Sequence, residues 1–170
     1  MNRPSYTERS WGIDLCGEIN RISLERGYEI KAGGEGGINA GGRRLFPDVL
    51  LRCDEEGVVQ GDVLHGWELK MPDTPIDDSA LLENAKEKAI LLGCDSFLVW
   101  NGRDAHFYKR EEESQNFSIK KKWPCPEIST REDMETKKDK WIATLNKILI
   151  EIDNYKVTGE LTPKRIIEVL

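Results

Sequence analysis

Apolar side chains recur at helical spacing near the start of the chain. The residues that repeat every three or four positions are Trp11, Leu15, Ile19 and Ile22. Together with Gly27, a residue type that commonly ends helices, this pattern predicts an amphipathic helix from about residue 7 to residue 26. At about 100° per residue, Glu18 falls within the apolar stripe. A carboxylate that faces a core needs a partner, so Glu18 is a candidate functional residue.

Two apolar runs, residues 44–53 and 58–71, follow a glycine-rich segment. They predict a β-hairpin, because both are rich in strand-forming residues and Gly57 in the turn between them can adopt a positive φ. The segment Gly33–Gly42 lacks the glycine spacing of a P-loop or of a dinucleotide-binding loop. It is either a flexible connector or a mobile loop over a nearby site, and it ends at the basic pair Arg43-Arg44.

A second helical pattern covers residues 80–93. Its N-cap is Asp78 or Ser79, and a glycine at its end supplies the stop. The apolar face consists of Leu81, Ala85, Ala89 and Leu92. Lys88 lies beside this face, and Asn84 lies one turn before Lys88. The helix therefore carries an amine and an amide toward the strands that precede it.

The second half of the chain predicts more strands and then helices. Residues 96–102 and 105–110 flank an Asn-Gly turn, which is a strong hairpin signal, and residues 116–123 are expected to extend the sheet. Residues 132–155 predict one long helix. Residues 156–170 form either a terminal helix or the start of a connector to a further domain, so we expect the main domain to span residues 1–155.

Composition limits the class of protein. With 170 residues, 38% apolar and 33% charged, the chain can bury a real core as one domain. A net charge of -6 argues against a protein that binds nucleic acid over its whole surface, so any phosphate-binding patch must be local. We expect a cytoplasmic protein without a membrane span or signal peptide, and four scattered cysteines that are reduced thiols. Basic patches occur at residues 43–44, 109–110 and 120–122.

A possible site emerges from the hairpin. Side chains two apart on a strand share a face, so Glu68 and Lys70 point the same way, and strand pairing can place Asp48 beside them. Two carboxylates held together on a half-buried sheet repel each other unless a cation lies between them. Oxygen ligands favour Mg²⁺ or Mn²⁺, and such an ion beside a lysine suits phosphodiester hydrolysis.

Simpler interpretations compete with this one. Acidic residues at strand ends are commonly solvated, and a Glu-x-Lys triplet occurs by chance in many chains. Asp62 could replace Glu68 as a ligand if the strand register shifted, although no lysine follows it two residues later. The histidines, His65 and His106, are expected to be packing or surface residues. The tryptophans of the strands, Trp67 and Trp100, are expected in the core.

The order of these motifs resembles the PD-(D/E)xK nuclease superfamily, which has the restriction-endonuclease-like fold. The matching residues are Pro47-Asp48 and Glu68-Leu69-Lys70, and residues 82–102 resemble the helix-to-strand segment of nuclease domains in restriction-modification enzymes. The resemblance implies an α/β protein with an αβββαβ core over about residues 7–109, a mixed central sheet flanked by helices, and a long C-terminal helix in addition.

The same resemblance implies roles for single residues. Asp48, Glu68 and the main-chain carbonyl of Leu69 would bind Mg²⁺, which Mn²⁺ can replace, and Lys70 would position the attacking water. Glu18 would assist as the first-helix acid. The groups that would contact phosphate or DNA are Lys88, Asn84, Arg43 and Arg44. Some relatives carry Gln-x-x-x-Tyr on the second helix, where this chain has Asn84 and Lys88.

The implied function is a metal-dependent endonuclease domain that hydrolyses double-stranded DNA to 5′-phosphate and 3′-hydroxyl ends. It would be the cleavage module of a bacterial restriction-modification system, with a fused or separate methyltransferase, helicase or specificity domain and possible dimerisation for double-strand cleavage. Two alternatives remain open. One is a non-catalytic nucleic-acid-binding or assembly domain of the same fold, and the other is a nuclease of repair or of mobile elements, or one that acts on RNA.

Overall fold

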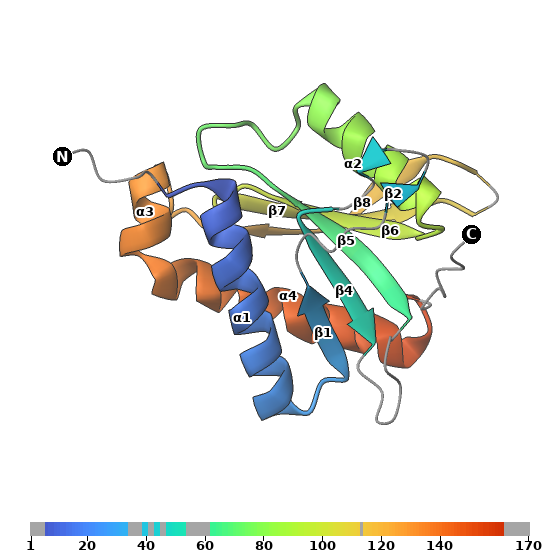
Figure 1. Ribbon diagram of the computed structural model, residues 1–170, viewed down its shortest axis with the longest axis horizontal. Coiled ribbons are helices and arrows are strands. Elements are labelled where there is room, and N and C mark those ends of the chain that lie inside the picture. Colours follow the sequence, from blue (N-terminus) through green and yellow to red (C-terminus); the bar gives the residue numbers. More distant parts are fainter. Residues whose placement is uncertain are drawn as a thin grey trace.

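A six-stranded mixed sheet with helices on both faces forms the centre of the protein, in a computed structural model (Figure 1). In spatial order the strands are β1 (Ile30–Gly33), β4 (Val49–Cys53), β5 (Val63–Leu69), β6 (Ser96–Trp100), β7 (Asp104–Arg110) and β8 (Phe117–Pro124). The helices are α1 (Glu8–Arg26), α2 (Ser79–Leu91), α3 (Arg131–Thr136) and α4 (Lys138–Thr158). The short strands β2 (Asn39–Ala40) and β3 (Arg43–Arg44) form a separate two-stranded ladder.

The structure describes residues 6–33, 39–40, 43–44, 47–53, 62–112 and 114–161, with the backbone alone for 39–40 and 43–44. Three expectations from the sequence lie wholly or mostly outside these residues. They are the turn at Gly57, most of the glycine-rich segment, and the terminal helix that begins at Thr162. The strand β1 has no counterpart among the runs picked out by apolar pattern, although the family resemblance implied a third strand before the second helix.

The first helix forms as the pattern predicts. The Thr7 hydroxyl accepts a hydrogen bond from the main-chain N–H of Ser10, and the Ser10 side chain accepts one from Thr7 in return, which completes a capping box. Gly27 ends the helix with φ of 73°, a left-handed conformation that favours glycine. Both signals are local, and this explains why the sequence alone located the helix to within about one residue.

The expected inward position of Glu18 is wrong. Its side chain is partly exposed and pairs with Arg21 on the surface of α1. The buried face of α1 also includes Gly12 and Ser23, which lie about 100° and 120° from Trp11 at 100° per residue. Because these small residues do not count as apolar in a pattern, the true centre of the buried face is shifted away from Glu18.

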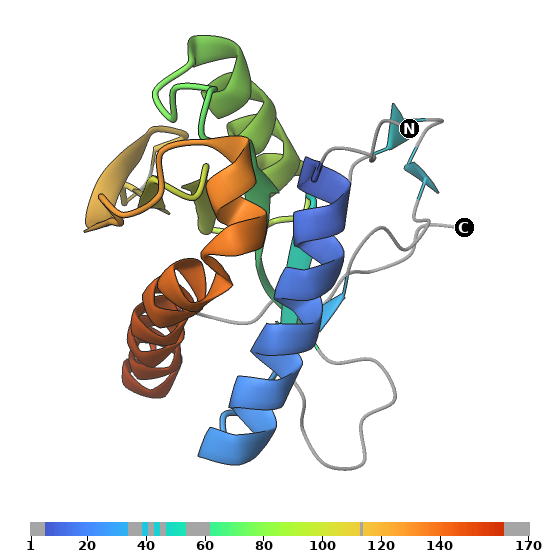
Figure 2. The same ribbon diagram turned by 90° about the vertical axis from the view of Figure 1, so that its left-hand side faces the viewer.

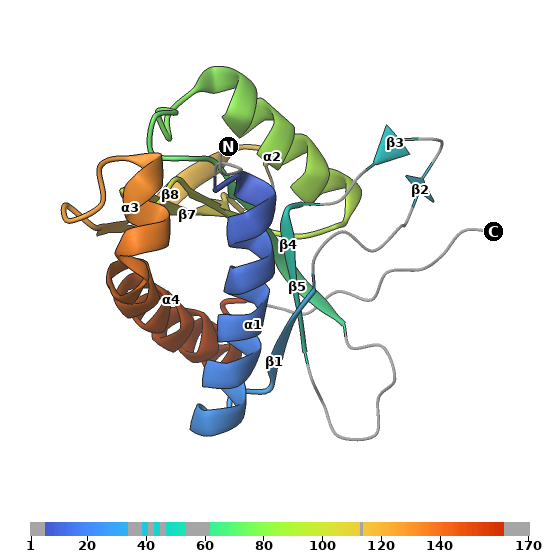
Figure 3. The same ribbon diagram turned by 60° about the vertical axis from the view of Figure 1, so that its left-hand side comes forward.

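The sheet is antiparallel except between β5 and β6, which run parallel. The parallel connection passes through α2, as crossovers between parallel strands usually do. In Figures 1 and 3, α2 lies on one face of the sheet, whereas α1 and α4 lie on the other. A larger core fills the space between the sheet and α1 and α4, and a smaller core lies beneath α2.

Local signals also explain the second half of the sheet. Asp78 caps α2 by accepting a hydrogen bond from the Leu81 N–H, which selects one of the two expected caps. The Asn-Gly turn joins β6 to β7, where Gly102 has φ of 86°. The buried Asn101 side chain accepts hydrogen bonds from the main-chain N–H groups of Arg103 and Asp104, and it donates one to the Thr74 carbonyl. The strand β8 extends the sheet, as predicted.

The single long helix expected over residues 132–155 is wrong, because the chain forms two helices. α3 begins at a capping box between Thr130 and Asp133, and Lys137, with φ of -122°, separates it from α4. The Trp141 indole N–H donates to the Met134 carbonyl across this break, so a tertiary contact stabilises it. α4 also continues to Thr158, beyond the expected domain boundary at residue 155. Figure 2 shows α1 and α4 on the same side of the molecule.

Two further expectations concern the chain as a whole. All four cysteines lie in the described residues, and none of them forms a disulfide, as expected. Across the described part of the chain, no helix is both long and apolar enough to cross a membrane.

Candidate active site

Asp48 and Glu68 lie side by side on neighbouring strands. The antiparallel register pairs Val49 with Trp67, so Asp48, one residue before β4, lies next to Glu68 near the end of β5. The main-chain N–H of Leu69 donates a hydrogen bond of 2.8 Å to Asp48 Oδ2. The pairing of β4 with β5 thus brings together two carboxylates that are far apart in the sequence, as the hairpin hypothesis required.

The Glu68 carboxylate is almost completely buried, with its side chain 6% exposed. Burial, and then the negative charge of Asp48, raise the pKa of Glu68 to about 7, although the positive charges of Lys88 and Lys70 oppose this shift. Lys88 Nζ lies 3.0 Å from Glu68 Oε1. The two groups are an ion pair at this distance, but the angles do not give this oxygen a well-formed hydrogen bond with any described residue. Glu68 is therefore a poorly solvated charge.

Asp48 is less enclosed and has a better-defined partner. Burial raises the pKa of the Asp48 carboxyl, while the Leu69 N–H and the charges of Lys88 and Lys70 lower it. The negative charge of Glu8, in the first turn of α1, adds to the increase. Both carboxyls of the pair thus have a raised pKa, and burial is the largest cause in each case.

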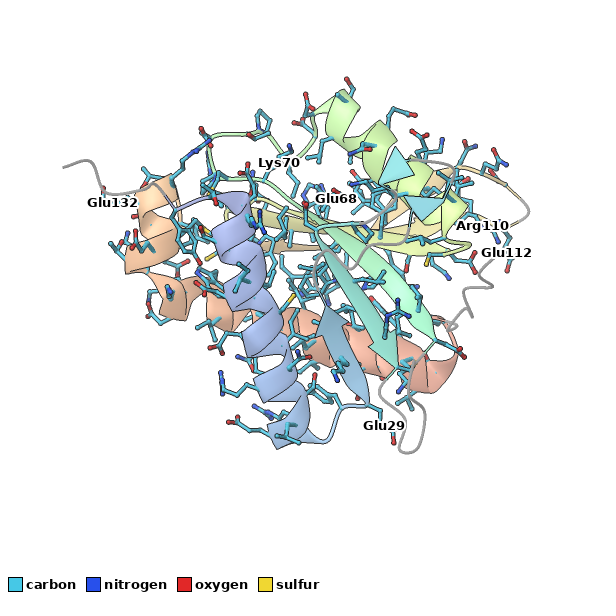
Figure 4. All side chains as sticks on the ribbon, in the orientation of Figure 1. Glu29, Glu68, Lys70, Arg110, Glu112 and Glu132 are labelled. Atoms are coloured by element: carbon cyan, nitrogen blue, oxygen red, sulfur yellow. The ribbon has the colours of Figure 1, made fainter. Side chains whose placement is uncertain are left out.

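Lys70 completes the cluster that the sequence predicted. It follows the last residue of β5 and is half-buried, and its main-chain N–H donates to the Trp100 carbonyl at 3.0 Å. Figure 4 places Glu68 and Lys70 at the same end of β5, on the side of the sheet that carries α2. The shared face follows from strand geometry, since residues two apart alternate back to the same side.

Pro47 is held in place by a glycine on the neighbouring strand. A side chain at Gly66 would overlap the Pro47 ring, so only glycine lets the ring lie directly over β5. Because Pro47 directly precedes Asp48, this packing fixes the position of Asp48 at the start of β4. The family motif supplied Pro47, but the sequence offered no sign that Gly66 faces it.

A cleft of about 660 Å³ adjoins Asp48 and runs along the first half of α1. The side chains and backbone that line it belong to Thr7, Glu8, Arg9, Gly12, Ile13, Cys16 and Asp48. Residues 8, 12 and 16 are four apart and therefore form one line along the helix. Glu8 thus occupies the place that the sequence analysis assigned to Glu18. The spacing of Glu8 from two small residues was the signal that could have identified it.

Other expected site residues are not brought into this cluster. Asn84 is exposed on α2, one turn before Lys88. Asp62 precedes β5 at the end opposite to Glu68, so the alternative in which it replaces Glu68 does not fit the observed register. The side chains of Arg43 and Arg44 are outside the described residues. His65 is fully buried, and His106 is half-buried.

The residues present suit a hard divalent cation. Asp48, Glu68 and the Leu69 carbonyl offer only oxygen ligands, which Mg²⁺ and Mn²⁺ prefer. No group of three His, Cys, Asp or Glu side chains within the described ranges could hold a metal ion. Mg²⁺ commonly binds through one or two carboxylates and keeps several waters, so a pair is sufficient. A bound cation would also lower the pKa of Glu68, and Glu68 Oε1 would be one of its ligands.

Comparison of the chain with protein-family models, curated proteins and solved structures gives no match.

Proposed function

We propose that the protein is a Mg²⁺-dependent endonuclease domain that hydrolyses DNA. The observation that carries this proposal is the pair of carboxylates, Asp48 and Glu68, with Lys70 on the same face as Glu68 and an open cleft beside Asp48. Other interpretations of an Asp-Glu-Lys set, such as a solvated strand end, do not account for a Glu68 side chain that is 6% exposed. Burying a charge without hydrogen bonds is costly, and functional sites are where proteins commonly accept that cost.

The order of elements supports the family resemblance. Leaving out the separate two-stranded ladder, the chain runs α1, β1, β4, β5, α2, β6, which is the αβββαβ order of restriction-endonuclease-like nucleases. The proposed ligands lie at the ends of β4 and β5, as the resemblance implies. We therefore infer the same fold family and, from the similarity of residues 82–102 to restriction-modification nucleases, a role as the cleavage module of such a system.

The roles of the residues follow from their positions. A bound Mg²⁺ would activate water and stabilise charge that develops on the phosphate. Asp48 and Glu68 would hold the ion together with the Leu69 carbonyl, and Glu8 would assist from α1 in the place first expected of Glu18. Lys70 would orient the attacking water and stabilise negative charge on the scissile phosphate.

Plasmid nicking tests the proposal. The full chain is incubated with supercoiled DNA and Mg²⁺ or Mn²⁺, beside the variants Lys70→Ala and Glu68→Gln. We expect metal-dependent nicking by the wild type and a loss of at least about 100-fold in both variants, because one loses a proposed metal ligand and the other a group that stabilises charge in the transition state. Chelation should abolish the activity.

Lys86→Ala is the matched control, because Lys86 is a half-buried lysine on α2 outside the cluster. It should nick like the wild type. Nicking that survives in Lys70→Ala, or that continues in the presence of a chelator, would contradict the proposal. If the wild type binds DNA but never cuts it with either metal, the non-catalytic alternative is supported instead.

A further inference from the structure

We propose that Lys88 is the internal counter-cation of the metal-free site, and that the divalent metal displaces it when it binds. This inference rests on the proposed function, since it concerns the same carboxylates. It adds a competition between a side chain and the metal, and it couples metal loading to the release of a lysine on α2.

The contact that supports this is the ion pair between Lys88 and Glu68. Their charged atoms are 3.0 Å apart, and the side chains are only 16% and 6% exposed. The lysine charge also acts on Asp48, because it lowers the pKa of that carboxyl as well. One ammonium group therefore compensates both proposed metal ligands, which is the electrostatic task of the metal.

The quality of the contact shows why displacement is feasible. Glu68 Oε1 is within ion-pair distance of Lys88 but has no well-formed hydrogen bond from any described residue. By contrast, Asp48 accepts a hydrogen bond of 2.8 Å from the Leu69 main chain, which fixes its position. Oε1 of Glu68 thus lies at ion-pair distance from Lys88 in a geometry that is less well defined than that of Asp48. A divalent ion offers it a stronger charge and direct coordination.

A displaced Lys88 has a clear second use. Its flexible four-carbon stem can move the ammonium outward along α2, toward solvent, without moving the helix. Asn84 is exposed one turn before it on the same helix. The released ammonium would then be available for a phosphate oxygen only after the metal has bound, so an anion is attracted to a loaded site and not to an empty one.

Amine labelling of the wild-type chain tests the displacement directly. The full chain is treated briefly with a trace of an amine-acetylating reagent, with and without Mn²⁺, and acetylation of each lysine is measured by mass spectrometry. The side-chain amine of Lys88 is expected to be protected without metal, because the ion pair with Glu68 keeps it protonated and buried, and to be acetylated several-fold faster at saturating Mn²⁺. Lys86, half-buried on the same helix, reports any general change in helix exposure and should be unaffected.

Metal affinity gives a second readout that does not depend on activity. Mn²⁺ binding is measured by calorimetry at pH 8.5, above the pKa of about 7 of Glu68 in the wild type, for the wild type, Lys88→Met and Lys86→Met. Methionine keeps the apolar stem and removes the charge. We expect Lys88→Met to bind Mn²⁺ roughly tenfold more tightly, because a competing cation has been removed, and we expect Lys86→Met to match the wild type.

The outcomes separate this inference from the proposed function. Suppose that the wild type binds Mn²⁺ and cuts DNA, that Mn²⁺ does not speed the acetylation of Lys88, and that Lys88→Met binds Mn²⁺ no more tightly than Lys86→Met. The displacement is then wrong and the nuclease proposal stands. If the wild type binds no Mn²⁺, both are overturned. Faster labelling of Lys88 with tighter binding by Lys88→Met supports the displacement even if the isolated chain does not cut DNA.

Discussion

Each face of β5 buries a polar side chain, and the two side chains differ in how many hydrogen-bond partners they have. On one face, His65 is fully buried and uses both ring nitrogens, since it accepts a hydrogen bond of 2.9 Å from the Trp67 indole and lies 3.1 Å from Ser96 Oγ. On the other face, Glu68 is almost equally buried but is held by one ion pair with Lys88. Both ring nitrogens of His65 have partners, whereas Oε1 of Glu68 has no hydrogen-bond partner among the described residues.

This difference is the one expected between a structural residue and a proposed metal ligand. Because Nε2 of His65 accepts from Trp67, Nδ1 carries the proton and donates to Ser96, so the ring is neutral and fixed. Burial, with a smaller contribution from Lys109, lowers the pKa of His65 to about 3, and the ring stays neutral at ordinary pH. Burial instead raises the pKa of Glu68 to about 7, where small changes alter its charge. A satisfied group stabilises the strand, whereas an unsatisfied one is available to a ligand.

The largest expected effect is the pH dependence of stability caused by Glu68. A pKa raised from 4.5 to about 7 in the folded state corresponds to roughly 3 kcal/mol. Below pH 4.5 the carboxyl is protonated in both states and costs nothing. Between pH 4.5 and 7 the unfolded chain releases this proton while the folded protein retains it, so the free energy of unfolding falls with rising pH relative to Glu68→Gln, and above pH 7 the deficit is constant.

Urea denaturation of both proteins at several pH values between 4 and 8.5, in the presence of a chelator, measures this difference. A gap between them that does not grow with pH would contradict the buried charge. Saturating Mg²⁺ should close the gap by stabilising only the wild type, because the variant lacks one of the two carboxylates.

The second effect is the loss of the His65 network. The change His65→Leu leaves the Trp67 indole N–H and the Ser96 hydroxyl buried without partners, and we expect a loss of about 2 kcal/mol in the free energy of unfolding. Unlike the effect of Glu68, this loss should be the same from pH 5 to pH 8.5. Urea denaturation over that range measures it, and a pH-dependent loss would show that the two faces are coupled. Ser96→Ala, with a smaller loss, is the control.

The third effect tests how Pro47 positions the site. The change Gly66→Ala places a methyl group where the Pro47 ring lies, so we expect a loss of about 1–2 kcal/mol in stability, typical of overpacking, and a shift of Asp48. Calorimetry with Mn²⁺ should then show weaker binding. Gly17→Ala on α1 is the control, since a methyl group there has no close neighbour and should leave binding unchanged.

The smallest effect is that of the acid on α1. Glu8 acts on Asp48 through its charge, so Glu8→Gln should weaken Mn²⁺ binding by only about two- to fivefold, or roughly 0.5–1 kcal/mol. Glu18→Gln is the matched control and should leave the affinity unchanged, because Glu18 pairs with Arg21 on the surface. Equal effects of the two variants would contradict the assignment of Glu8.

Much of the fold could be predicted from the sequence because its signals are local. The glycine that ends α1, the cap of α2 and the Asn-Gly turn depend on residues within a few positions of each other. Gly27 and the turn were identified, and Asp78 was one of two candidates for the α2 cap. The break at Lys137 was missed because the hydrogen bond that stabilises it, from the Trp141 indole to the Met134 carbonyl, forms only when α3 and α4 pack together. The strand β1 was missed because four residues give too short an alternation to recognise.

The candidate site divides in the same way. Alternation along a strand was enough to predict that Glu68 and Lys70 share a face, and strand pairing was enough to predict that Asp48 lies beside them. The pairing of Lys88 with Glu68, and the position of Glu8 near Asp48, depend on how the helices pack and could be seen only in the folded protein. The physical reason is that burial is a property of the assembled molecule: small residues such as Gly12 and Gly66 set which surfaces approach closely, and no pattern of apolar positions records that.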